Sequence, residues 1–274
     1  MGIDLTTLAA YYDQIPGWTG EVPAGFAANF LGSLTDLNFL AQMPPSPGSE
    51  VTFARGPGAH RPTRPSLSWG EAFFEYSAIA LAASDAKATF TMMELGGGFA
   101  ARSVDAALFL RRHRPDLRPF LVVVEAEQTH FAWAKDHFKT NGLDPDEHWL
   151  LNVALGESTT PVLFPIGEGQ FDNTVVPPTT RQHLIDLLKR SGQQAMDGAL
   201  WNLLAAGRMG VALHSSTAPE GRTFDYGFVS AVPLRDVIAP LPAVDLIDMD
   251  PRKDVAPRPA SSSGTRPRRP IGRT

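Results

Sequence analysis

Apolar and polar residues between positions 68 and 155 repeat with two periods, one typical of helices and one typical of strands. Ser68 and Glu71 have the spacing of a capping box, which satisfies free backbone N–H groups where a helix begins. Apolar residues at helical spacing follow through Ser84, and a β-rich run then occupies residues 88–95. This stretch therefore predicts a helix followed by a strand.

The alternation continues beyond this strand. Residues 103–114 have helical periodicity, and residues 118–126 contain a continuous apolar run, as in a parallel strand covered on both faces. A third helix is predicted over 129–140, where an Asn-Gly pair ends it, and a third strand over 148–155. Strand, helix, strand, helix, strand is the order of a doubly wound α/β sheet.

The flanking regions have weaker patterns. Short helices are predicted near Leu5–Tyr12 and Phe26–Leu40, before a loop rich in proline and glycine over residues 43–66. Beyond the central unit the predictions are two helical pieces over 187–209, a strand at 228–232, a short helix at 233–241 and a buried strand at 244–250.

Residues 251–274 have a composition unlike the rest of the chain. They contain seven Lys or Arg, one Asp and five prolines but almost no large apolar residue, so they cannot bury enough surface to offset the entropy of ordering. We expect a disordered basic tail there, after an N-terminal helical and loop extension (1–67) and a single α/β domain (68–250). The whole chain has a net charge of -5 and the tail +6, so the body carries -11, which disfavours nucleic acid as a partner.

Composition excludes several classes of site and location. The chain has no cysteine, which rules out disulfides, thiolate nucleophiles and cysteine-bound zinc, and its seven histidines show no paired metal spacing. The N-terminus lacks the basic and apolar runs of a secretory signal, and no uncharged apolar stretch approaches the roughly 20 residues that span a bilayer. We therefore expect a cytoplasmic protein that does not associate with membranes.

The segment ELGGGFA (94–100) lies between the first predicted strand and the next helix. Glycines let a ligand approach the backbone closely, and in an open α/β sheet ligands bind at this turn. The helix that follows begins with free N–H groups and positive potential, suited to a carboxylate or phosphate. Glu125, at the end of the next strand, has the position of a carboxylate that accepts hydrogen bonds from both ribose hydroxyls.

These features are compatible with two kinds of nucleotide site. Gly96, Gly98 and Ala101 fit the spacing G-x-G-x-x-A of dinucleotide sites, so an NAD-dependent oxidoreductase is one alternative. Glu94 favours a methyl donor instead, because a carboxylate two residues before the first glycine has the position to face an ammonium group.

The series ELGGGFA (94–100), VVVEAEQTHFAWAKDHFKTNGL (122–143), LLNVALGE (150–157) and VDLIDMD (244–250) resembles the FkbM-type methyltransferase family over roughly residues 68–250. The second segment is the most specific. The resemblance implies a Rossmann-like class I methyltransferase sheet and S-adenosyl-L-methionine as cofactor. It also implies O-methylation of a hydroxylated small molecule or glycan.

The resemblance assigns roles to individual residues. It implies a cofactor contact for Glu94, Gly96, Gly97 and Gly98 on the methionine part, for Glu125 on the ribose, and for Ala126, Asn152 and Ala154 near the adenine. Glu75 and Tyr76, on the preceding helix, are expected to close over the methionine end.

The candidate catalytic residues are Asp248 and Asp250, at the end of the last predicted strand. Carboxylates there can orient a hydroxyl nucleophile or hold a divalent ion, and the alternative is a solvated acid pair.

The chain departs from the family pattern at two places. Ala100 stands where a third glycine is often found, and the Pro- and Arg-rich tail replaces the strands that should follow VDLIDMD. We therefore expect a class I sheet that lacks its C-terminal strands, as in a truncated or frame-shifted product, and a homodimer that covers the open sheet edge. A catalytically inactive remnant that only binds the cofactor is the third functional alternative.

Overall fold

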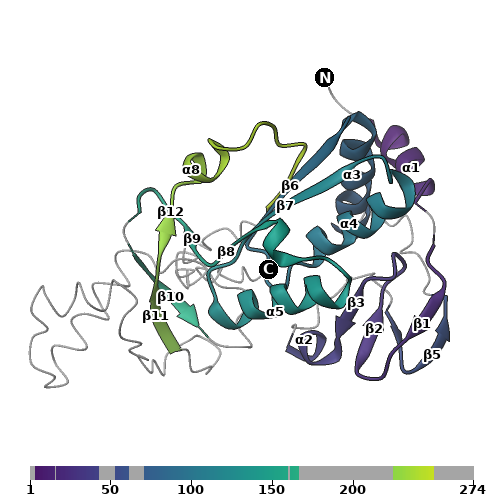
Figure 1. Cartoon of the computed structure of the whole chain (residues 1–274), viewed down its shortest axis with the longest axis horizontal. Coiled ribbons are helices and arrows are strands. Elements are labelled where there is room, and N and C mark those ends of the chain that lie inside the picture. The colour runs from purple at the N-terminus through teal and green to yellow at the C-terminus, as the bar shows by residue number, and fades with distance from the viewer. Residues whose placement is uncertain are drawn as a thin grey trace, which may run out of the picture.

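The computed structural model describes residues 4–15, 17–42, 53–61, 71–159, 161–166 and 225–249. Its central feature is a four-stranded parallel sheet (Figure 1), made of β6 (Thr89–Leu95), β7 (Arg118–Val124), β8 (Trp149–Leu151) and β13 (Leu246–Met249). The strand order is β8-β7-β6-β13. The α/β class and the parallel sheet predicted from the sequence are confirmed, and the strand order is compatible with a Rossmann-like fold.

Successive side chains of the central strands point alternately into two cores. Phe90 and Met92 of β6 belong to one core, whereas Met93 and Leu95 pack with Val237 into the other. Burial on both faces explains why these strands are apolar at nearly every position. The first core is covered by α1 (Leu5–Asp13), α3 (Glu71–Asp85), α4 (Ala101–His113) and α5 (Gln128–Thr140), and the second by α8 (Leu234–Ile238).

The N-terminal region contains one confirmed and one wrong prediction. The helix near Leu5–Tyr12 is present as α1, but the helix near Phe26–Leu40 is wrong. That stretch forms the antiparallel strands β2 (Phe26–Ala28) and β3 (Leu34–Asp36), followed by the short helix α2 (Leu37–Gln42). Asn29 Oδ1 accepts the backbone N–H groups of residues 31 and 33, and Gly32 has a φ of 75°, so a tight turn replaces helical hydrogen bonds.

Three further short strands lie in this region: β1 (Gly20–Val22), β4 (Ala54–Arg55) and β5 (Gly58–His60). β1 pairs with β5 and β4 pairs with β2, both antiparallel, so part of the predicted 43–66 loop is strand. Tyr12, Ile15, Phe30 and Leu31 are buried in the same core as the parallel sheet. The N-terminal residues therefore pack onto the α/β unit.

Two predicted strands are each divided in the structure. The 148–155 stretch gives β8 in the main sheet and β9 (Ala154–Leu155), which pairs in parallel with β12 (Ala231–Val232). The 228–232 stretch is shared between β12 and β11 (Asp225–Val229). β11 pairs antiparallel with β10 (Val162–Ile166), a strand that was not predicted, and a 3-10 helix, η1 (Pro145–Glu147), precedes β8.

The last two elements agree with the sequence, since α8 lies within the helix predicted at 233–241 and β13 within the strand predicted at 244–250. Other predictions fall outside the described residues: the helical pieces over 187–209, the capping residue Ser68, Asp250 and the tail at 251–274. In the described part of the chain no helix is long and apolar enough to cross a bilayer.

Candidate functional site

The site predicted from the sequence lies where the strand order of the sheet reverses. The chain leaves β6 through α4 on one face and enters β13 after α8 on the other face. In open α/β sheets ligands bind at such a point, beyond the carboxyl ends of the strands. The structure brings Glu94, the glycine loop, Glu125 and Asp248 together at that end of the sheet.

The glycine loop after β6 is fixed to the end of β7. The N–H groups of Gly96 and Gly97 both donate to the carbonyl of Val124, at 2.9 and 3.1 Å. A Cβ added to Gly97 would lie 2.7 Å from Cγ1 of Val123, so the close approach of loop and strand requires glycine there. Gly96 and Gly98 have φ values of 79° and 53°, in the left-handed region.

Ala100 also lies in the left-handed region, with φ 61° and ψ 45°, as the residue before α4. It is the single non-glycine residue with positive φ in the described part of the chain. Such a conformation costs roughly 1–2 kcal/mol for an alanine and persists where the surroundings hold it. The missing third glycine noted in the sequence therefore has a structural consequence, which is a strained turn at the loop's end.

The carboxylate of Glu94 turns towards the start of α4. Its oxygens accept the backbone N–H groups of Arg102, at 3.2 Å, and Ser103, at 2.8 Å, and the residue is 6% exposed. Burial, and after it the charge of Asp248, raises the pKa of Glu94 to about 8. The helix start expected to offer these N–H groups to an anion is therefore filled by an acid of the protein itself.

Glu125 connects β7 to the glycine loop. Its Oε2 accepts the N–H of Gly98 and its Oε1 the N–H of Glu127, both at 2.7 Å, and the residue is 7% exposed. Burial raises the pKa of this carboxyl group. Each oxygen of a carboxylate has a second acceptor site, so a contact with ribose remains chemically open.

The three residues predicted near the adenine lie beyond Glu125. Asn152 is exposed, and its Nδ2 donates to the carbonyls of Glu125 and Ala126 at 2.9 and 3.1 Å. Ala126 and Ala154 are buried in a small apolar cluster with Ala231. Asn152 therefore holds the turn after β7, while Ala126 packs with Ala154 of β9 and Ala231 of β12.

Asp248 is the register neighbour of Glu94 on the adjacent strand β13 and is half-buried. Its predicted partner Asp250 lies outside the described residues. Within the described ranges no group of three or more His, Cys, Asp or Glu side chains is arranged to hold a metal ion.

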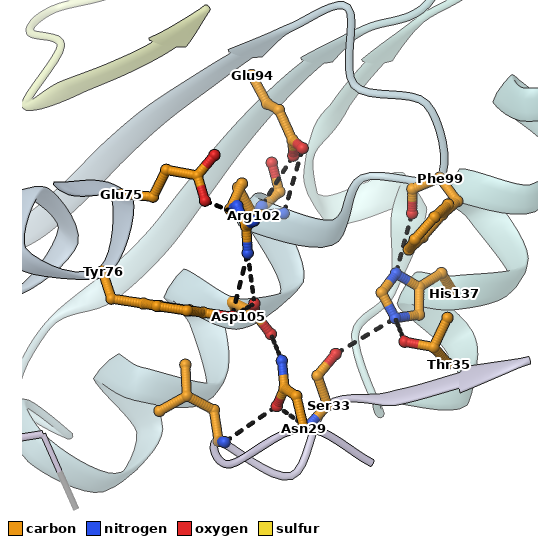
Figure 2. Close-up of polar contacts among 12 residues, drawn as sticks. Asn29, Ser33, Thr35, Glu75, Tyr76, Glu94, Phe99, Arg102, Asp105 and His137 are labelled. Carbon is orange, nitrogen blue, oxygen red and sulfur yellow. Dashed lines mark hydrogen bonds and ion pairs between the residues drawn. The ribbon is translucent and has the colours of Figure 1, made fainter. Parts of the chain in front are cut away.

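A buried polar network beside the loop was not predicted from the sequence (Figure 2). The Tyr76 hydroxyl donates to Asp105 Oδ2 at 2.9 Å, and Arg102 donates to the Tyr76 oxygen at 3.1 Å. Arg102 also forms an ion pair of 2.5 Å with Glu75, and Asn29 Nδ2 donates to Asp105 Oδ1 at 2.7 Å. The sequence signal was Asp105, an acid in an apolar helical stretch, where burial demands polar partners.

This network changes the expected role of the α3 residues. Tyr76 is 1% exposed, and burial together with Asp105 raises its pKa well above the ordinary value. Its hydroxyl holds Asp105 instead of closing over a ligand. Glu75 holds Arg102, which contacts the Tyr76 ring with its guanidinium carbon 5.1 Å from the ring centre.

A cavity of about 330 Å³ lies at the opposite end of the strands. It is bordered by the last turn of α4, the start of β7 and the residues before β8, and its polar lining consists of Arg111, Arg118, Asp144, Glu147 and His148. None of the residues predicted to bind the cofactor lines it.

No family model, curated protein or solved structure matches this chain in comparisons with known proteins.

Proposed function

We propose that this protein is an S-adenosyl-L-methionine-dependent methyltransferase. The observation that carries the proposal is the position of Glu94, which fills the start of α4 and lies beside Asp248. Two acids at the switch point of the sheet favour a ligand that carries positive charge. The sulfonium and ammonium groups of S-adenosyl-L-methionine have that charge.

The same observation disfavours the dinucleotide alternative. A pyrophosphate binds at the helix after the glycine loop by accepting its free N–H groups. Here the N–H groups of Arg102 and Ser103 donate to Glu94, and a phosphate would also meet the charge of Asp248. An NAD-dependent oxidoreductase is therefore the weaker proposal, although the glycine spacing permits it.

The remaining site residues suit a nucleoside with a cationic end. Glu125 is proposed to bind the ribose, and Asn152, Ala126 and Ala154 to border the adenine. The bound cofactor would supply a methyl group that the acceptor oxygen attacks as the carbon–sulfur bond breaks. Asp248, half-buried at the same end of the sheet, is proposed to accept the hydroxyl proton of a small-molecule or glycan acceptor, with Asp250 as the second candidate.

Calorimetric titration of the full chain tests the proposal, with S-adenosylhomocysteine in one experiment and NADH in another. We expect micromolar affinity for the first and none for the second. Glu125→Gln should weaken binding about tenfold or more, as expected for one charge-assisted hydrogen bond. Glu127→Gln is the matched control, because Glu127 is also buried but caps α5 by accepting the N–H of His130.

The outcomes separate the three functional alternatives. A folded protein that binds NADH and not S-adenosylhomocysteine would be an oxidoreductase. Binding of S-adenosylhomocysteine without methyl transfer to any hydroxylated acceptor would identify an inactive remnant. With S-adenosyl-L-methionine at pH 7, the measured heat should depend on the buffer, because a cationic ligand favours ionised Glu94 and so releases its proton.

A further inference from the structure

Residues 29–39 of the N-terminal region contact the glycine loop and the helices next to it. We call them the 29–39 segment. It includes the turn after β2, the strand β3 and the first part of α2. In Figure 1 these elements lie beside α5, apart from the parallel sheet. Three sets of contacts join the segment to the loop and to the helices on either side of it.

The first contact fixes α4. Asn29 uses its Nδ2 to donate to Asp105 at 2.7 Å and its Oδ1 to accept the N–H groups of Leu31 and Ser33. Asn29 and Asp105 are both buried, and Asp105 is in turn bound by Tyr76. The N-terminal part of α4, which directly follows the loop, is therefore tied to the 29–39 segment.

The second contact reaches the loop through His137 of α5 (Figure 2). His137 Nδ1 lies 2.9 Å from the carbonyl oxygen of Phe99, so Nδ1 carries the proton and donates it. Its Nε2 is then the acceptor for the hydroxyls of Ser33, at 3.3 Å, and Thr35, at 3.5 Å. Burial lowers the pKa of His137 to about 4, so the ring is neutral at pH 7 and this hydrogen-bond pattern is stable.

The third contact holds the side chain of Phe99, which is the first loop residue after the glycines. The Phe99 ring contacts two other rings, His137 at a centroid distance of 5.3 Å and Phe39 of α2 at 5.7 Å. Phe39 also stacks on Trp133 at 4.8 Å. Both the carbonyl and the ring of Phe99 are thus fixed immediately before the strained residue Ala100.

We propose that the 29–39 segment is part of the cofactor site, as a positioning element that holds Phe99 and Asp105 and thereby keeps the glycine loop in its binding conformation. A strained turn at Ala100 relaxes unless its neighbours are held, and the segment supplies that restraint. The proposal rests on the proposed function for the identity of the ligand. The restraint on the loop itself is measurable without any ligand.

The test compares Phe39→Ala with Ile15→Ala in the full chain. Both replace a buried apolar side chain of the N-terminal region, but Phe39 packs against the Phe99 ring of the loop, whereas Ile15 follows α1 and lies outside the 29–39 segment. Native-state hydrogen exchange is measured at the amides of Gly98 and Ser103 and compared with amides of β7 in the same protein. We expect Phe39→Ala to raise the ratio of loop to strand exchange about tenfold, which corresponds to roughly 1.4 kcal/mol of lost restraint, and Ile15→Ala to leave it unchanged.

Phe39→Leu keeps apolar contact with Phe99 and should restore most of the protection. Ser33→Ala, which removes one hydroxyl from His137, is the second test if Phe39→Ala does not fold, and should raise the loop ratio about fivefold. The affinity for S-adenosylhomocysteine should fall in Phe39→Ala and not in Ile15→Ala.

An unchanged loop ratio in Phe39→Ala and Ser33→Ala, or an equal rise in Ile15→Ala, would overturn the positioning role. If the wild-type protein fails to bind S-adenosylhomocysteine while the loop ratio still rises, the proposed function is wrong and the restraint on the loop stands.

Discussion

Replacing Glu94 with glutamine should change how the stability of the protein depends on pH. Glutamine keeps the size of the side chain and one acceptor for the N–H groups of α4, but it cannot lose a proton. In the wild type, burial and the neighbouring Asp248 raise the pKa of Glu94 from 4.5 to about 8. The folded protein therefore binds this proton more tightly than the unfolded chain does.

The sign and size of the effect follow from linkage. As pH rises from 4.5, the unfolded chain loses the Glu94 proton first, so the free energy of unfolding decreases until the folded state also loses it near pH 8. The difference between 4.5 and about 8 corresponds to roughly 5 kcal/mol, or about 1.4 kcal/mol per pH unit. Stability from this group is fully present below pH 4.5 and is lost above pH 8.

Urea unfolding at pH 5, 6, 7 and 8 measures this dependence in both proteins. Titrating groups far from Glu94 affect both proteins alike, so the difference between the two curves reports Glu94 together with its coupling to Asp248. We expect Glu94→Gln to gain about 4 kcal/mol relative to the wild type between pH 5 and pH 8. In Asp248→Asn the free energy of unfolding should stop falling at a lower pH than in the wild type, because the charge that is the second cause of the raised pKa of Glu94 is removed. Curves that remain parallel within about 1 kcal/mol would refute the reasoning, since Glu94 would then ionise normally in the fold.

Two further predictions concern the loop and its support. The first compares Ala100→Gly with Ala106→Gly, which both lose a buried methyl group. Ala100→Gly relieves a positive φ, whereas Ala106→Gly weakens the interior of α4, so the Ala100→Gly protein should be roughly 2–3 kcal/mol more stable than the Ala106→Gly protein. Urea unfolding checks this, and equal losses would show that Ala100 is not strained. His137 is held neutral with a pKa of about 4, against 6.5 in the unfolded chain, so stability should fall by up to roughly 3 kcal/mol as pH falls from 6.5 to 4. His137→Gln should remove that decline, and a variant that keeps it would contradict the assignment.

The sequence by itself determined the central α/β unit. The periods of apolar residues located β6, α4, β7 and α5, because strands buried on both faces and helices buried on one face leave different patterns. Glycines and acids at the ends of the predicted strands located the candidate site, since glycines mark tight turns and acids mark polar strand ends. These signals depend only on neighbouring residues, so one sequence is enough to detect them.

The tertiary structure decided what those side chains contact. Glu94 was placed at the site from the sequence, but only the fold shows its carboxylate bound to the start of α4 and beside Asp248. The predicted helix over Phe26–Leu40 is wrong because Asn29 organises a turn there instead. The amide of Asn29 donates to Asp105, which lies 76 residues further along the chain. Periodicity describes a segment's own burial and carries no information about distant partners. Polar contacts between distant segments form when the packed core buries both groups, because each buried polar group then needs the other as its hydrogen-bond partner.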